Sequence, residues 1–226
     1  MYPYRPSRRR FLRSAPLGAV AALGSSSLLR NPLAAQTPAT SDAALQELMA
    51  GNQRFIAGRL TAHEHDLAVL KQHTVDKQEP FAAILSCSDS RVPLELIFDQ
   101  SIGHIFVSRV AGNVVTPELI ASIEFSVAVL GVKAILVMGH SGCGAVKAAM
   151  EGKSVPGQIS SLFPHIQPAV EQAGGNLETA IEANARIQAG LLRTASTIVS
   201  GAVKSNKVKV VAGCYDLGTG KVALLS

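Results

Sequence analysis

The sequence predicts an α/β domain with a mostly parallel sheet (four parallel strands plus an antiparallel edge strand) flanked by helices. Short apolar runs alternate with segments of helical periodicity. Three of these runs are almost continuously hydrophobic, as is typical of strands buried on both faces of a parallel sheet. The last run follows its predecessor after a short glycine-containing turn, so these two strands should pair in antiparallel fashion.

The elements are expected in the following order. Apolar residues at helical spacing predict an amphipathic helix over about 42–57, with Ser41 or Asp42 as its N-cap. A second helix is expected over 62–74. Strands are predicted at 81–85, 105–107, 134–138, 208–211 and 221–225. Further helices are predicted at about 117–131, 143–151 and 176–203.

Length and composition favour one globular domain of ordinary size. The chain has 226 residues, of which 47% are hydrophobic and 16% charged, and this excludes wholesale disorder. The formal net charge is +5, but residues 1–35 contain six arginines and no acidic residue. The rest of the chain has a net charge of −1 by the same count, so nucleic acid is not expected as a partner.

Residues 1–35 are predicted to be a signal peptide, followed by a linker at 36–41 and the folded domain at 42–226. The leader has a basic start, a soft apolar middle and small residues near its end. Its basic motif resembles a twin-arginine export signal: Ser7-Arg8-Arg9-Arg10-Phe11-Leu12. This resemblance implies the twin-arginine export machinery as a partner and a periplasmic or otherwise exported location.

Reactive side chains follow two of the predicted parallel strands. Cys87 lies just after the first strand, and His140 and Cys143 lie at the end of the third. The carboxyl ends of parallel strands share one edge of a sheet, where ligands bind, so these three residues are expected to converge. Two thiolates and one imidazole favour zinc, and three protein ligands leave the open position typical of a catalytic site.

Other interpretations of these residues remain open at this point. A single cysteine is most often a small buried hydrophobic residue, and this is our interpretation of Cys214, without excluding a redox-sensitive thiol. A Cys–His hydrolase is a further alternative, although two thiolates with one imidazole suit a metal better than acyl transfer.

Several motifs resemble those of β-class carbonic anhydrases over about residues 42–225. The two metal motifs are Cys87-Ser-Asp89-Ser-Arg91-Val-Pro and His140-Ser-Gly-Cys143-Gly. Further matches are Gly51-Asn52-Gln53-Arg54-Phe55, Glu95-Leu-Ile-Phe-Asp99, Arg109-Val-Ala-Gly-Asn113, Tyr215-Asp216 and Thr219-Gly220-Lys221.

The resemblance implies reversible hydration of carbon dioxide to bicarbonate and a proton by zinc-bound hydroxide. It implies one Zn²⁺ per chain, held by Cys87, His140 and Cys143, and a catalytic dyad of Asp89 and Arg91 beside the metal. It also implies a homodimer or an assembly of dimers. The positions that match the family's substrate pocket are Gln78, Phe106 and Gly144.

Alternatives to this activity are hydrolysis of carbonyl sulfide or carbon disulfide on the same scaffold, and a non-catalytic zinc-stabilised binding protein in which Asp89 closes the site. Some family members have a regulatory bicarbonate site built from Trp, Arg and Tyr. Arg109 matches the arginine of that site, but the chain contains no Trp. We therefore expect this regulation to be absent or differently built.

Overall fold

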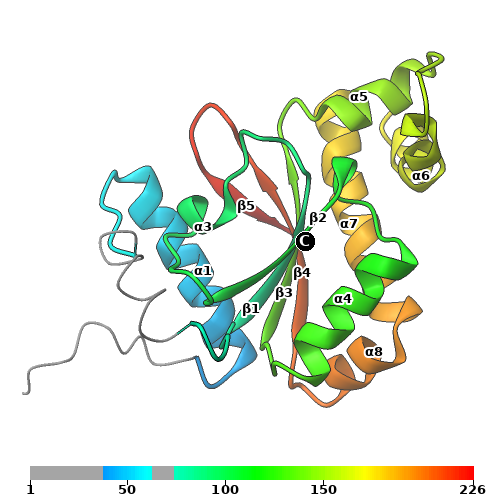
Figure 1. Ribbon diagram of the computed structural model, residues 1–226. Coiled ribbons are helices and arrows are strands. Elements are labelled where there is room, and N and C mark those ends of the chain that lie inside the picture. Colours follow the sequence, from blue (N-terminus) through cyan, green and yellow to red (C-terminus); the bar gives the residue numbers. More distant parts are fainter. Residues whose placement is uncertain (1–37, 63–73) are drawn as a thin grey trace, which may run out of the picture. The chain divides into compact units, whose positions relative to one another are not determined.

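The computed structural model describes residues 38–62 and 74–226, which form an α/β domain around one five-stranded sheet (Figure 1). The strand order is β2-β1-β3-β4-β5, with the first four strands parallel and β5 antiparallel to β4, as predicted. The strands are β1 (Ala82–Ser86), β2 (Ile105–Arg109), β3 (Ala134–His140), β4 (Lys209–Tyr215) and β5 (Val222–Leu225).

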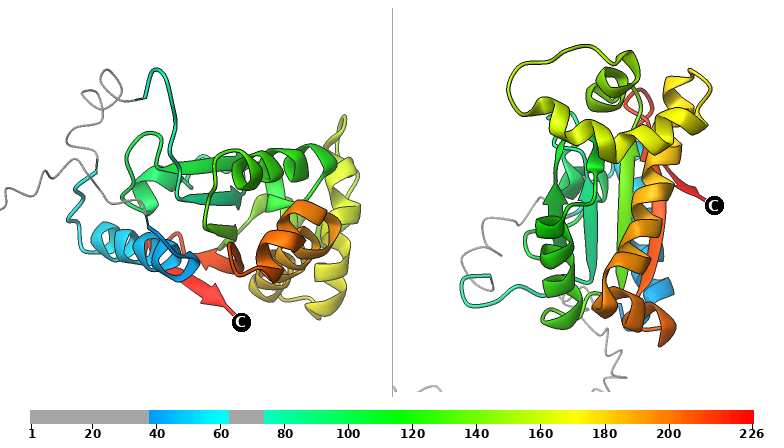
Figure 2. Two further views of the ribbon diagram at one scale, coloured as in Figure 1. Left: turned by 90° about the horizontal axis from the view of Figure 1, so that it is seen from below. Right: turned by 90° about the vertical axis from the view of Figure 1, so that its right-hand side faces the viewer.

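Helices cover both faces of the sheet (Figure 1). One face is covered by α1 (Ser41–Ile56) and α3 (Leu94–Ile97), and the other by α4 (Pro117–Ala128), α7 (Leu177–Ala195) and α8 (Thr197–Lys204). Figure 2 shows α5 (Gly144–Glu151) and α6 (Phe163–Gln172) lying across one end of the sheet. Short 3₁₀ turns occur at Ala111–Asn113 and Ile159–Leu162.

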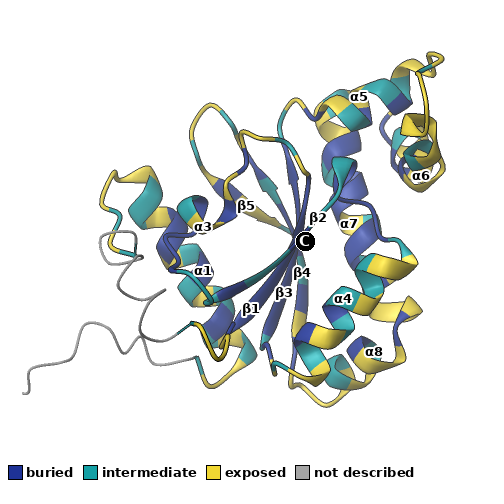
Figure 3. Ribbon diagram, in the orientation of Figure 1, coloured by how far each residue is buried: buried dark blue, intermediate teal, exposed yellow. Residues whose placement is uncertain are grey.

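The central strands are buried on both sides, which explains their continuous hydrophobicity (Figure 3). In β1, Ala82 and Ile84 pack toward the face of α1, whereas Ala83 and Leu85 pack toward α4 and α7. A third apolar group lies between α5, α6 and α7 and includes two of the cysteines, Cys87 and Cys143.

The strand order places a ligand-binding position between β1 and β3. The chain passes from β1 to β2 on one side and then to β3 on the other, so the order of strands reverses between β1 and β3. In open parallel sheets, the carboxyl ends of the strands at such a reversal form a crevice. The loops after β1 and β3 meet there, and these loops contain the predicted site residues.

Several element boundaries differ from the prediction. Thr40, not Ser41 or Asp42, is the N-cap of α1, because its hydroxyl accepts a hydrogen bond from the Ala43 amide at 3.2 Å. The helix predicted over 176–203 is two helices, since Ser196 has extended backbone angles and caps α8 through the Val199 amide. The helices α3 and α6 were not predicted.

Two predictions concern residues that the structure does not describe. The helix expected over 62–74 falls almost entirely in 63–73, and the leader at 1–35 and the first two linker residues fall in 1–37; both ranges lie outside the described residues. Among the residues that are described, none of the helices has the length and apolar character needed to cross a bilayer.

Candidate metal centre

Three buried side chains from two adjacent strands meet at the carboxyl edge of the sheet. Cys87 follows β1, His140 is the last residue of β3, and Cys143 is the N-cap of α5. Their ligand atoms all lie within 4.8 Å of one another, and the two sulfurs are 4.0 Å apart. The convergence expected from the strand order is therefore present.

The imidazole of His140 presents one nitrogen to this cluster. Its Nδ1 lies 3.1 Å from the carbonyl oxygen of Ser141, so Nδ1 is the protonated nitrogen that donates this hydrogen bond. Its Nε2 is buried and has no hydrogen-bond partner among the described residues. A buried polar atom without a partner is costly, and a neutral Nε2 with a hydrogen-bonded Nδ1 is the usual form of a metal ligand.

The two thiols are strongly coupled because they are close together. The hydrogen bond with Cys143, helped by contacts with His140 and the amide of Gly112, outweighs the opposing effect of burial, and the pKa of Cys87 falls to about 4. The same hydrogen bond raises the pKa of Cys143, since a second negative charge would lie beside the first. The two sulfurs therefore hold one proton between them, and a metal cation that binds both sulfurs would release it.

Asp89 lies beside the cluster and is held by Arg91. The guanidinium donates to both carboxylate oxygens, at 2.9 and 2.8 Å, and the Arg91 amide donates to Oδ1 at 2.9 Å. These hydrogen bonds hold the pKa of Asp89 far below its usual range. Its Oδ2 lies 3.8 Å from Nε2 of His140, so an ionised carboxylate faces the cluster.

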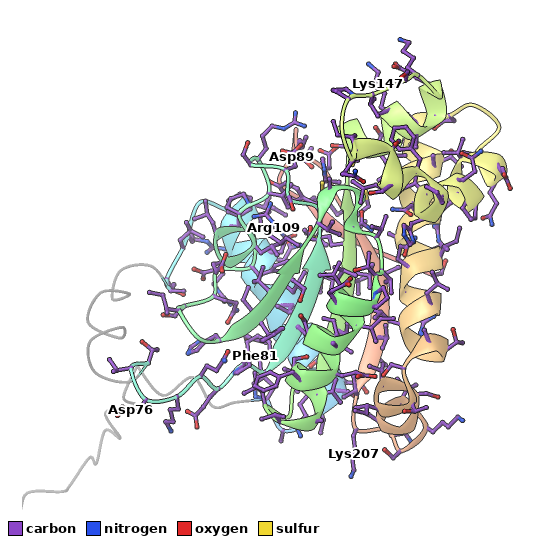
Figure 4. All side chains as sticks on the ribbon, turned by 45° about the vertical axis from the view of Figure 1, so that its right-hand side comes forward. Asp76, Phe81, Asp89, Arg109, Lys147 and Lys207 are labelled. Carbon is purple, nitrogen blue, oxygen red and sulfur yellow. The ribbon has the colours of Figure 1, made fainter. Side chains whose placement is uncertain are left out.

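Arg109 supports the loop that contains Cys87 and Asp89. From the end of β2, its Nε donates to the carbonyl of Cys87 at 2.9 Å, and a terminal nitrogen donates to the carbonyl of Asp89. Figure 4 shows Asp89 and Arg109 near each other at this end of the sheet. The sequence motifs matched Arg109 to a regulatory site and did not predict this supporting role. Its position at the end of a predicted parallel strand could have indicated that it lies near the metal ligands.

The predicted substrate-pocket residues are not gathered around the cluster within one chain. Gln78 is exposed and precedes the amino end of β1, and Figure 4 shows Asp76 and Phe81, which flank it, at the opposite end of the sheet from Asp89. Phe106 pairs with Ala83 in the sheet and packs against Phe125, with ring centroids 6.4 Å apart. Only Gly144 adjoins the cluster, as the first residue of α5.

The third cysteine lies apart from the three-residue cluster. Cys214 in β4 is half-buried and unpaired, and it packs against the apolar group of α5, α6 and α7. Burial raises the pKa of Cys214 to about 12, which makes it a poor thiolate donor. This placement agrees with the packing role expected from the sequence.

Comparison with known proteins now identifies the family. The family model for carbonic anhydrase matches residues 82–222, a span that includes all three residues of the cluster. Carbonic anhydrase 2 of Mycobacterium tuberculosis is 32% identical over 190 residues, covering 80% of this chain and 91% of that protein. The β-carbonic anhydrase CafA of Aspergillus fumigatus is 27% identical, with a TM-score of 0.64 over 80% of this chain and 90% of the other. The chain belongs to the carbonic anhydrase family, in its β-class.

A further β-carbonic anhydrase structure extends the agreement in fold. It is one of two tetrameric enzymes from Sordaria macrospora, with 22% identity, a TM-score of 0.65, and coverage of 80% of this chain and 96% of the other. The mostly parallel sheet flanked by helices is thus the β-carbonic anhydrase fold. The family resemblance seen in the motifs, and the α/β architecture predicted from the apolar runs, are both confirmed.

Proposed function

We propose that this chain is a zinc enzyme that catalyses the reversible hydration of carbon dioxide to bicarbonate and a proton. One Zn²⁺ per chain is bound by Cys87, His140 and Cys143. The observation on which this assignment depends is the buried Nε2 of His140, which finds no hydrogen-bond partner in the described part of the chain and lies in one cluster with two cysteine sulfurs. Membership of the β-carbonic anhydrases supports the reaction.

The donor set and its spacing fit zinc. Two thiolates bound to a tetrahedral zinc at about 2.3 Å each would lie about 3.8 Å apart. The observed separation of 4.0 Å requires almost no movement. Two sulfurs and one imidazole nitrogen are typical zinc ligands, and three protein ligands leave a fourth position for water.

Zinc bound here would supply a Lewis acid that makes water a nucleophile near neutral pH, a property for which carbonic anhydrases are the established example. The chain's own residues orient the reacting molecules. Asp89, kept ionised by Arg91, accepts a hydrogen bond from the reacting water and thereby directs an oxygen lone pair toward carbon dioxide. Arg109 holds the backbone of Cys87 and Asp89, which fixes the distance between the metal ligand and this acceptor.

A combined metal and activity measurement tests this function. The purified full chain should contain about one equivalent of zinc and accelerate proton release from carbon dioxide in stopped-flow experiments at neutral to mildly alkaline pH. Activity should disappear after chelation and return when zinc is added. Zinc-loaded protein without turnover would contradict the proposal, and release of sulfide from carbonyl sulfide in place of carbon dioxide hydration would redirect it to that substrate.

We also propose export by the twin-arginine pathway and a periplasmic or otherwise exported location. The support is the basic motif in residues 1–35 and the soft apolar stretch after it. In a host with this pathway, the wild-type chain should be found outside the cytoplasm. The double variant Arg8→Lys and Arg9→Lys should remain inside, and equal export of both proteins would contradict the proposal.

A homodimer or an assembly of dimers is the quaternary structure that we propose. The Sordaria neighbour is described as tetrameric, and Gln78, which matches a substrate-pocket position, is exposed far from its own chain's cluster. Two apolar side chains are also exposed at the C-terminal end of α4, Phe125 (46%) in the helix and Val129 (64%) at its C-cap. Light scattering on the purified protein should give a multiple of two chains; a monomeric mass would refute this arrangement.

A further inference from the structure

Helix α7 buries two polar side chains in an otherwise apolar face. Asn184 and Gln188 are spaced by one helical turn and are fully buried, with 0% exposure, among alanine, isoleucine and leucine residues. Buried amides destabilise a protein unless their hydrogen bonds are made. The partners of these two amides therefore show what the helix holds in place.

The two amides form a short chain of hydrogen bonds that ends on the loop after β2. Gln188 accepts a hydrogen bond from the Val115 amide at 2.8 Å and donates to Oδ1 of Asn184 at 3.1 Å and to the carbonyl of His165 at 2.9 Å. Asn184 in turn donates to the carbonyl of Gly112 at 2.8 Å. Both ends of the segment 112–115 are thus attached to α7.

This segment has a backbone that needs outside support. Gly112 has φ 75° and Asn113 has φ 45°, and the left-handed region is unfavourable for a residue with a side chain. The segment also places the Gly112 amide against Sγ of Cys87, at 3.3 Å. An amide that donates to a thiolate withdraws electron density from the sulfur and fixes its position.

We propose that Asn184 and Gln188 are positioning residues for the metal centre, which hold the Gly112 amide against the Cys87 sulfur and so set zinc affinity and the electron donation of that thiolate. The inference rests on the proposed function only in taking Cys87 as a zinc ligand. Removal of partners beyond the direct ligands typically lowers metal affinity about 10–100-fold.

Two variants test the chain of hydrogen bonds. Asn184→Leu and Gln188→Met replace the amides by apolar groups of similar size, and Leu192→Ala is the matched control because Leu192 is equally buried on α7 but packs in a different apolar group. Zinc affinity is measured by competition with a chelator on full-length protein whose folding is checked by circular dichroism. Cobalt substitution adds the sulfur-to-metal charge-transfer band, which reports electron donation by the thiolates.

The expected result is a loss of zinc affinity of about 10-fold or more in both variants, with the cobalt charge-transfer band shifted to lower energy, because the thiolate loses a hydrogen bond. The control should keep both properties while unfolding at a lower temperature. Unchanged affinity and band in a folded variant, or an equal loss in Leu192→Ala, would overturn the proposal.

One measurement needs no variant of α7. In wild-type protein loaded with NMR-active cadmium, the Gly112 amide proton should show scalar coupling to the metal through the Cys87 sulfur, and absence of this coupling would also overturn the proposal. Comparison of the variants Cys87→Ser and Asn184→Leu separates this inference from the proposed function. If Cys87→Ser keeps its metal, the ligand assignment itself is wrong; if Cys87→Ser loses its metal while Asn184→Leu binds normally, only the positioning role is wrong.

Discussion

Replacing Gly112 by alanine should damage both the fold and the metal centre. Gly112 has φ 75°, and a Cβ atom added to it would lie 2.9 Å from Cδ1 of Ile166 and 3.4 Å from Cβ of Ala145. The first contact is closer than carbon atoms tolerate, so either Ile166 or the loop must move. The Gly112 amide is in this loop, so a displaced loop draws the amide away from the Cys87 sulfur.

The expected loss of stability has two contributions, backbone strain at Gly112 and crowding against its neighbours. Alanine in the left-handed region costs about 1 kcal/mol, and crowding in a packed interior adds about 2 kcal/mol. A total of about 3 kcal/mol lowers the melting temperature of a domain of this size by about 9 °C. Loss of the amide from the sulfur should also weaken zinc binding by about 10-fold.

The control is Gly152→Ala at the end of α5. Gly152 has φ 59°, but no atom lies within 4 Å of its added Cβ, so this variant has the backbone strain without the crowding. Thermal unfolding of the metal-free proteins and chelator competition with zinc measure the two effects separately. If Gly112→Ala and Gly152→Ala lose the same stability and both keep wild-type zinc affinity, the reasoning about this loop is refuted.

Three other predictions concern the ligands and two carboxylates. Cys87→Ser or Cys143→Ser should lose both zinc and turnover, as measured by metal analysis and stopped-flow assay; full activity in either would refute the ligand assignment. Asp89→Asn should keep zinc but reduce kcat at least about 10-fold, because the acceptor that orients the water is lost, and an unchanged kcat would contradict this role. Asp99→Asn should destabilise the domain by about 3 kcal/mol, since it removes the buried partner of Arg54. Burial raises the pKa of Asp99, but hydrogen bonds from Ala62, Arg54 and Thr61 outweigh this and lower it overall. Its contribution to stability is therefore present above the unfolded-state pKa of about 3.9 and is lost as the pH falls through the folded-state value. Denaturant unfolding from neutral pH to below pH 4 should show the difference between Asp99→Asn and wild type shrinking with acidity, and a difference independent of pH would be inconsistent with an ionised Asp99.

Much of the fold could be predicted because its signals are local. Continuous apolar runs identify strands covered on both faces, and the turn before 221–225 identifies the antiparallel edge. The break at Ser196 was missed because apolar periodicity continues across it, while the serine leaves the helical conformation and caps the next helix. Asn184 and Gln188 could have been singled out from the sequence, because they are polar residues on the otherwise apolar, buried face of a predicted helix.

The metal cluster was predictable for a different reason. Parallel strands share one carboxyl edge, so the strand pattern alone places Cys87 and His140, which are separated by 53 positions, close together. Gln78 and Phe106 were assigned to the pocket by resemblance alone. The structure places them away from the cluster within one chain, because Gln78 precedes β1 at its amino end and Phe106 packs against α4.

The sequence alone determined the donor set, its position at strand ends and the α/β architecture, since residue type and hydrophobic periodicity are properties of the chain itself. The tertiary structure decided which nitrogen of His140 faces the sulfurs, how Arg91 and Arg109 hold the loop of Asp89, and which helix supports the Gly112 amide. These features depend on hydrogen bonds between segments far apart in the chain. Their geometry exists only after the helices have packed on the sheet, and for that reason no local pattern encodes it.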